Sequence, residues 1–284
     1  MKSHLPSPSP APAQLAPKCI ISKLAADADM ELAMPAALTD GEFIPYYQPL
    51  MSNTGEIRGC EALMRWMRAD GSFISPGEFI PLAERNGFIT DLGAYVLQAA
   101  VRQLRLFDEA GLEHLYMSVN VSPRQLEHPG FEAMLAQALV DAGVAPQRLV
   151  LELTEGVAVT DRAHTRALLD RIAATGVRIA LDDYGTGYAS LGYLRAYPVS
   201  TVKIDRSFIE GLAQDEVSAI LVKAVVDLSK ALQLEVVAEG VETALQAQVL
   251  REMGVTYLQG YLYGPAMPAG ELVARFGPSP ALLN

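Results

Sequence analysis

The stretch "EFIPYYQPLMSNTGEIRGCEALMRW", residues 42–66, contains two strand-like segments separated by only four residues. Asn53 and Gly55 lie in that separation, and both are residues that tight turns favour. Parallel strands need a crossover of a dozen or more residues, so a connection this short joins antiparallel neighbours. The sequence therefore predicts that the fold begins with a β-hairpin.

Beyond the hairpin, strand and helix patterns alternate. We expect helices over 90–111, with Thr90 or Asp91 as N-cap and Gly111 as the stop, and over 162–174, 214–232 and 243–252. Six more strands are expected at "LYMSVNV" (115–121), "RLVLELTE" (148–155), "VRIALDD" (177–183), "TVKID" (201–205), "LEVVAEG" (234–240) and "YLQGYLYG" (257–264). This order predicts an α/β fold, a modified TIM (β/α)8 barrel with one antiparallel strand; an open doubly wound sheet is the alternative.

The N-terminal region has a different composition. Residues 1–17, "MKSHLPSPSPAPAQLAP", are rich in Pro, Ser and Ala, which is typical of an extended tail or linker. Residues 18 to 40 have a weak helical pattern that Pro35 should interrupt. We therefore expect a tail or linker with a short helix over residues 1–40 and one folded domain over 41–284.

Composition limits the kinds of partner. The net charge of −11 and pI near 4.9 argue against a broad basic face for nucleic acid or an anionic membrane. No apolar run approaches the roughly 18 residues of a membrane span, and the N-terminus lacks a signal-peptide pattern. The only cysteines, Cys19 and Cys60, predict no structural disulfide, which fits a reducing cytoplasm. None of the four histidines stands in a motif, so neither a zinc site nor a Ser-His-Asp triad is expected.

Almost every predicted strand ends on a polar side chain that could reach one rim of a barrel. These residues are Glu61, Asn120, Glu152, Asp182 with Asp183, Lys203, Glu239 and Gln259. Clustered carboxylates repel one another unless cations separate them. Oxygen-only ligands favour Mg²⁺ or Mn²⁺ over zinc, so the pattern predicts a site for one of these hard cations.

The stretch "IALDDYGTGYAS", residues 179–190, places two aspartates side by side where a strand ends. At the end of the strand, Asp182 can face the barrel axis while Asp183 turns onto the following loop. Gly185 and Gly187 let that loop bend sharply. Each aspartate could then serve a different ion of a pair about 3.5–4 Å apart, the arrangement used in phosphoester hydrolysis. We therefore expect two ions per site.

At these residues the sequence resembles the EAL domain, a family of cyclic di-GMP phosphodiesterases. The motifs that carry the resemblance follow the family's order: "CEALMRW", "FIPLAERNG", "SVNVSP", "LELTE", "LDDYGTGYAS", "TVKIDRSFI", "VVAEGVET" and "LQGYLYG". Together they span residues 42 to about 269. The resemblance implies a barrel with one antiparallel strand and metal-dependent hydrolysis of cyclic di-GMP to linear pGpG. Such an activity lowers this second messenger in bacterial signalling.

The resemblance also implies roles for individual residues. The implied metal ligands are Glu61, Asn120, Glu152, Asp182, Asp183 and Glu239. The implied catalytic residues are Lys203, which positions or polarises the attacking water, Glu239, which assists proton removal, Glu61 and Asp183. The implied substrate contacts are Gln48, Leu63, Arg65, Asp205, Glu242 and Gln259, with Arg65 on a phosphate and Gln48 on a guanine. Glu155 is implied as the hydrogen-bonding anchor of the Asp-Asp loop.

Several alternatives stay open on the sequence alone. Lys203 could form a structural pair with Asp205, Arg65 could belong to an exposed ion pair, and Glu155 could be a plain surface residue. Cys60 is expected to be a buried structural thiol. The segment "PAMP" after Gly264 departs from the family pattern, so the last loop could contact substrate differently.

The whole domain has alternatives too. One is a non-catalytic cyclic di-GMP receptor that acts through a protein partner. Receptors of that kind lose metal ligands or the loop motif, and this chain keeps both. An enolase-type barrel would not explain the Gly-Thr-Gly loop. By resemblance we expect a homodimer that meets near the Asp-Asp loop, and the N-terminal segment could join a regulatory domain.

Overall fold

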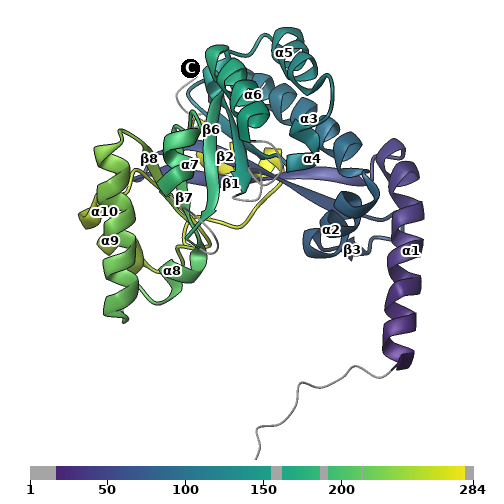
Figure 1. The fold of residues 1–284 in the computed structure, drawn as a ribbon, viewed down its shortest axis with the longest axis horizontal. Coiled ribbons are helices and arrows are strands. Elements are labelled where there is room, and N and C mark those ends of the chain that lie inside the picture. Colours follow the sequence, from purple (N-terminus) through teal and green to yellow (C-terminus); the bar gives the residue numbers. More distant parts are fainter. Residues whose placement is uncertain (1–16, 155–161, 186–190, 213, 279–284) are drawn as a thin grey trace, which may run out of the picture.

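The computed structural model describes residues 17–154, 162–185, 191–212 and 214–278 (Figure 1). Eight strands close into a barrel: β1 (Phe43–Ser52), β2 (Ile57–Met67), β4 (Tyr116–Asn120), β5 (Leu149–Thr154), β6 (Arg178–Tyr184), β7 (Thr201–Ile204), β8 (Glu235–Ala238) and β9 (Tyr257–Gln259). A further short strand, β3 (Phe73–Ile74), pairs with β2 outside the barrel.

The hairpin produces the irregularity of the barrel. β1 runs antiparallel to both of its neighbours, β2 and β9, and the pairs from β2 through β4 to β9 are parallel. The β1–β2 pairing closes the sheet on itself, which excludes an open doubly wound sheet. The modified TIM barrel with one antiparallel strand is therefore confirmed.

Helices surround the barrel (Figure 1): α2 (Pro76–Asn86), α3 (Ile89–Glu109), α4 (Pro123–Leu126), α5 (Phe131–Ala142), α6 (Arg162–Ala174), α7 (Leu191–Ala196), α8 (Arg206–Glu210), α9 (Glu216–Ala231), α10 (Ala244–Met253) and α11 (Ala269–Phe276), with a 3-10 turn at Pro146–Arg148. The expected helices all form. The longest of them, α3, has Phe88 rather than Thr90 or Asp91 as its N-cap. None of the helices in these described ranges combines the length and apolar character that a membrane crossing needs.

The apolar core lies between the outer face of the barrel and the helices. In β5, Leu149, Leu151 and Leu153 are buried in this core, while Glu152 between them points the other way, toward the barrel axis. If β5 paired one residue out of register, its two faces would be exchanged and the Glu152 carboxylate would be buried among the helices. Core packing therefore determines which side chains reach the centre of the barrel.

The N-terminal helix α1 (Pro17–Thr39) corrects the expectation that Pro35 ends the helical segment. Proline removes one backbone hydrogen bond, but here its ring lies on the exposed side of the helix. Met34 and Ala37, before and after Pro35 in the sequence, are buried in the core and hold the helix in place. The core thus includes residues before the expected boundary at residue 41. Figure 1 shows the first half of α1 projecting away from the barrel.

The last strand is shorter than expected. β9 ends at Gln259, and residues 260–263 form a bend and turn instead of continuing the strand to Gly264. Gly260 has a φ of 154°, and a Cβ there would lie 2.2 Å from the backbone of Val241, so only glycine fits. The "PAMP" segment, which differs from the family pattern, then returns to the barrel, where Met267 pairs with Tyr47 of β1.

Candidate active site

Lys203, on β7, lies at the centre of a group of carboxylates inside the rim of the barrel. Its Nζ is 2.6 Å from Glu239 Oε1, 2.8 Å from Glu152 Oε2, 3.2 Å from Asp182 Oδ1 and 3.5 Å from Glu61 Oε2. Its side chain is only 2% exposed. One buried ammonium therefore bonds to four acidic residues. Glu152 and Asp182 lie near the ends of β5 and β6 and Glu239 directly follows β8, but Glu61 lies within β2 and not at its end as expected.

Strand register brings these residues together. Asn120 on β4 pairs with Glu152 on β5, and Thr154 pairs with Asp182 on β6. Across the hairpin, Gln48 lies opposite Glu61. Parallel strands present their carboxyl ends on the same edge, so these residues converge on one rim although they are far apart in sequence.

Asp182 and Asp183 face the same site because β6 is irregular at this point. The pairing of β6 with β7 shifts register between Leu181 and Tyr184, and Asp183 has a φ of 54°, which is rare for a residue other than glycine. The strand continues to Tyr184, so a bulge rather than the end of the strand places the second carboxylate. Unusual backbone of this kind is often found at functional sites.

The cluster carries more negative charge than its lysine can balance. Burial lowers the pKa of Lys203, but the four carboxylates around it raise it well above its ordinary value, so the ammonium stays charged. Burial and the neighbouring Glu61 charge raise the pKa of Glu152 well above its usual range. Burial raises the pKa of Glu239 to about 8, against the opposing effect of Lys203.

Glu61 differs from these two carboxyl groups. Burial would raise its pKa, but the charge of Lys203 and hydrogen bonds from Gln259 and Asn120 bring it below the ordinary value. Asn120 Nδ2 donates to Glu61 Oε1 at 2.7 Å, and Gln259 Nε2 donates to Glu61 Oε2 at 2.7 Å. Glu61 is therefore held as a charged carboxylate in a fixed orientation.

The residues present fit divalent cations. Ligand oxygens of Asp182, Asp183 and Glu239 all lie within 4.8 Å of one another. With all five carboxylates ionised, they and one lysine carry four net negative charges, which two divalent cations would neutralise. The donors are all oxygen, the set that Mg²⁺ and Mn²⁺ prefer. Asn120 would join them once its amide rotates, because its nitrogen rather than its oxygen now faces Glu61.

Gln259 supplies a further polar atom to the site. Its Nε2 is shared between Glu61 and Gln48, whose Oε1 lies 3.1 Å away. Its Oε1 is buried and accepts no hydrogen bond from the part of the chain that the structure describes. A buried acceptor without a donor destabilises the fold, so this oxygen is suited to accept a hydrogen bond from a bound molecule.

A cavity of about 250 Å³ opens over the carboxylates. It is lined by the expected substrate contacts Gln48, Leu63, Asp205, Glu242 and Gln259, and also by Arg206 and Tyr261, which the sequence did not single out. Tyr261 is 69% exposed at the rim. An aromatic residue directly after Gly260 could have been noticed, but the segment was expected to be a strand.

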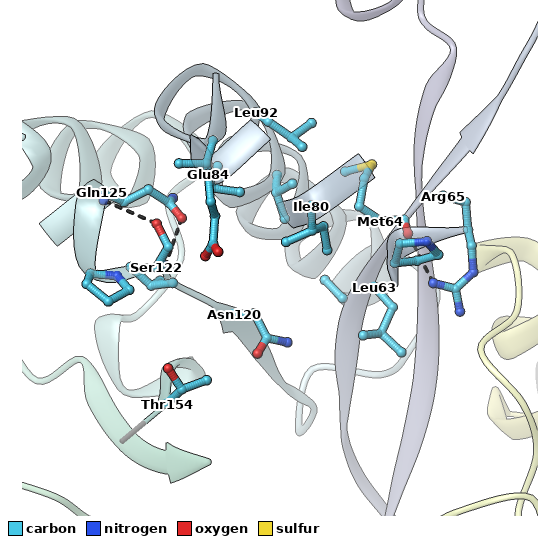
Figure 2. Close-up of a pocket in the computed structure, with 17 residues that line it drawn as sticks. Leu63, Met64, Arg65, Ile80, Glu84, Leu92, Asn120, Ser122, Gln125 and Thr154 are labelled. Carbon is cyan, nitrogen blue, oxygen red and sulfur yellow. Dashed lines mark hydrogen bonds between the residues drawn. The ribbon is translucent and has the colours of Figure 1, made fainter. Parts of the chain in front are cut away.

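A second cavity, of about 230 Å³, shares one lining residue, Leu63, with the first. It lies between β2, the end of β4 and helices α2 and α3 (Figure 2). Its walls are mostly apolar, with Ile80 and Leu92 on one side and Asn120 on the other. Arg65 belongs to this second cavity, not to the one over the carboxylates.

Two of the open alternatives are answered by the structure. Lys203 bonds to the four carboxylates and not to Asp205, whose carboxylate instead caps helix α8 by accepting from Ser207 N. Arg65 is half-buried, donates to the carbonyl of Met64 and lies over the ring of Tyr46, so it is not an exposed ion pair. Glu155 and Gly187 lie outside the described residues, and the anchoring role of Glu155 stays a prediction.

Cys60 is a buried free thiol, as expected. It is fully buried on the helix-facing side of β2, where Sγ lies 3.6 Å from Met117 Sδ. Burial and the adjacent Glu61 charge raise its pKa well above its usual range. The thiolate is therefore disfavoured, and a structural role follows.

Comparison with known proteins agrees with this geometry. The EAL domain model matches residues 31–266. The bifunctional diguanylate cyclase/cyclic di-GMP phosphodiesterase MucR of Pseudomonas aeruginosa is 42% identical over 239 residues, covering 84% of this chain and 35% of MucR. The cyclic di-GMP phosphodiesterase PdeL of Escherichia coli is 36% identical over 245 residues, covering 86% of this chain and 68% of PdeL.

A solved structure is similar as well. The PaMucR phosphodiesterase in complex with c-di-GMP superposes with a TM-score of 0.81 at 40% identity, covering 86% of this chain and 99% of that one. The chain spans about a third of the length of MucR itself. The similarity of sequence and fold extends over most of the chain. This chain therefore belongs to the EAL domain family.

Proposed function

We propose that this domain hydrolyses one phosphodiester bond of cyclic di-GMP to give linear pGpG, with two Mg²⁺ or Mn²⁺ ions per site. The observation that carries the proposal is the cluster around Lys203, in which all five expected acidic ligands, Glu61, Glu152, Asp182, Asp183 and Glu239, lie together beside a cavity. The names of MucR and PdeL support the choice of substrate.

The residues divide the chemistry between them. The ions would be held by Glu61, Asn120, Glu152, Asp182, Asp183 and Glu239. When bound, two divalent cations supply the Lewis acidity that generates a nucleophile at neutral pH and stabilises the leaving oxygen. Lys203 can direct the attacking water with its charged Nζ, and Glu239, whose Oε1 lies 2.6 Å from that Nζ, can accept a proton.

The two cavities can accommodate an extended dinucleotide. A phosphodiester over the carboxylates would leave one base free to enter the apolar cavity beyond Leu63. Arg65 lines that cavity, and in this proposal its guanidinium pairs with a phosphate. The other base would lie toward the exposed ring of Tyr261. Gln48 lines the same cavity, as does Gln259, whose Oε1 accepts no hydrogen bond from the described residues.

Metal dependence tests the proposal. Mg²⁺ and Mn²⁺ should each support turnover, and an excess of chelator should remove it, because the site has only oxygen donors. Ca²⁺ should support binding of cyclic di-GMP with little hydrolysis, since it tolerates looser geometry. The measurement is pGpG formation against each ion in turn. Full activity in excess chelator would contradict the metal site.

We also propose that the domain forms a homodimer through the exposed apolar face of α9. Val217, Ile220 and Leu221 recur at helical spacing on this face and are 61%, 60% and 45% exposed. Beside them a groove of about 350 Å³ reaches Tyr184 and Gly185, the residues that follow the aspartate pair. A second copy is the proposed occupant because the groove is continuous with the active-site strand.

A cytoplasmic location stays a prediction.

The dimer prediction can be measured by sedimentation velocity. Ile220→Asp places a charge in the proposed interface and should raise the dimer dissociation constant by roughly tenfold or more, equivalent to about 1.4 kcal/mol. Val140→Asp is the matched control, because Val140 is an exposed apolar residue on α5. An unchanged dimer in Ile220→Asp, or a monomeric wild-type chain, would rule out this interface.

A further inference from the structure

Two of the expected substrate contacts lie on neighbouring segments that no strand pairing joins. Asp205 directly follows β7 and Glu242 lies in the loop after β8, and both line the cavity over the carboxylates. The Asp205 carboxylate accepts a hydrogen bond from Ser207 N at the start of α8, so its orientation follows that helix. Glu242 is exposed, so its place depends on the backbone of its loop. The spacing of these two contacts therefore depends on how α8 sits against residues 239–243.

The buried side chain of Gln246, on α10, joins these two segments. It is only 7% exposed. Its Oε1 accepts hydrogen bonds from the backbone nitrogens of Glu242 and Thr243, both at 2.9 Å. Its Nε2 donates to the carbonyl oxygen of Ile209 in α8, also at 2.9 Å. One amide group thus uses both of its ends to connect the loop after β8 with the helix after β7.

Capping of α10 explains only half of this arrangement. Thr243 Oγ1 accepts from Gln246 N at 3.2 Å and Gln246 Oε1 accepts from Thr243 N, which is a reciprocal capping box. A capping box needs only an acceptor oxygen from its third residue, so glutamate would serve equally well. The bond to Ile209 needs the amide nitrogen. The bridge to α8 is therefore separable from the cap.

The two segments meet at a close contact that has few side-chain atoms. A Cβ on Gly240 would lie 2.4 Å from Cβ of Arg206, the first residue of α8. A smooth contact of this kind sets the separation of the segments but opposes sliding weakly, whereas the hydrogen bonds of Gln246 oppose it directly. Glu239 is held by other groups: its backbone nitrogen donates to Ile204 O at 3.1 Å, and its carboxylate pairs with Lys203.

We propose that Gln246 is a positioning residue, which holds α8 against the loop after β8 so that Asp205 and Glu242 meet the substrate together. The inference rests on the proposed function and adds to it a residue that touches neither substrate nor metal. Displacement of a binding group by about 1 Å can cost up to about a hundredfold. Because Glu239 and Lys203 are held separately, loss of the bridge should impair substrate binding and leave the chemical step intact.

The test uses two substitutions of Gln246 and two controls. Gln246→Glu keeps the acceptor oxygen of the cap and removes the donor to Ile209, whereas Gln246→Met removes both without adding a buried charge. Gln248→Glu makes the same chemical change at an exposed position of α10, and Thr243→Val weakens the cap alone. Affinity for cyclic di-GMP is measured by calorimetry in Ca²⁺, kcat and KM are measured in Mg²⁺, and thermal melts identify the folded proteins.

We expect both Gln246 variants to weaken binding of cyclic di-GMP roughly tenfold and to raise KM similarly, with kcat within about twofold of the wild type. Both controls should keep wild-type affinity. Unchanged affinity in folded Gln246→Met would overturn this inference alone, as would a fall in kcat with unchanged KM, or an equal loss in Thr243→Val. Because affinity is measured in Ca²⁺, a wild-type chain that binds without hydrolysis would overturn the proposed function alone. A wild-type chain that does not bind would overturn both.

Discussion

Lys203→Met should lower turnover of cyclic di-GMP by about a thousandfold, equivalent to about 4 kcal/mol of transition-state stabilisation. Its ammonium bonds to Glu61, Glu152, Asp182 and Glu239, and no other described residue places a cation among them. Methionine keeps the length of the side chain but removes the charge that directs water and holds Glu239. Removing one partner of a buried ion pair also destabilises a fold by about 3–5 kcal/mol, so melting temperature must be measured alongside activity.

Metal titration separates two roles for this lysine. If Lys203 only balanced charge, saturating Mg²⁺ would replace it and restore activity to Lys203→Met. If it takes part in the reaction, the variant should bind Mg²⁺ at least as tightly as the wild type and still fail to turn over. Lys23→Met, an exposed lysine on α1, is the control and should retain wild-type kinetics. Recovery of activity at high Mg²⁺ would remove the catalytic role of Lys203.

Asp183→Asn should lower turnover by roughly a hundredfold or more, about 2.7 kcal/mol, while cyclic di-GMP affinity changes far less. The change removes one negative charge and keeps the shape of the side chain. Asp183 completes the group with Asp182 and Glu239 that would hold the second ion. Substrate affinity should survive because Arg65, Gln48 and the first ion's ligands are untouched.

Single-turnover rate and cyclic di-GMP affinity are measured on the same Asp183→Asn protein. Asp141→Asn provides the control, since Asp141 is exposed on α5 and hydrogen-bonds only to Gln137 among the described residues. A surviving rate would show that the second ion does not depend on Asp183. A fall in affinity equal to the fall in rate would show that this aspartate binds substrate instead.

Much of the barrel and its site could be predicted because the signals are local. The four-residue connection at 52–55 determines an antiparallel pair, and the polar residues at successive strand ends mark one rim. Glu152 between Leu151 and Leu153 already indicates a strand with an apolar outer face and a polar inner one. Parallel pairing of neighbouring strands then aligns the inward-facing polar side chains, so that they meet around Lys203.

Other features depend on packing that no local pattern contains. Helix α1 passes Pro35 because Met34 and Ala37 are buried against distant elements. The bulge at Asp183 arises from the pairing of β6 with β7, and the close approach of Gly260 to Val241 ends β9 early. Tyr261 lines the cavity over the carboxylates because the chain turns after Gln259, where the sequence pattern had predicted a continuing strand.

The most direct test of the account is the fate of cyclic di-GMP when the wild-type chain is incubated with it and Mg²⁺, followed by chromatographic separation. The cluster of carboxylates around Lys203 predicts conversion of cyclic di-GMP to linear pGpG, with no product once chelator is added. Cyclic di-GMP that is bound but recovered intact would contradict the account and identify the domain as a receptor.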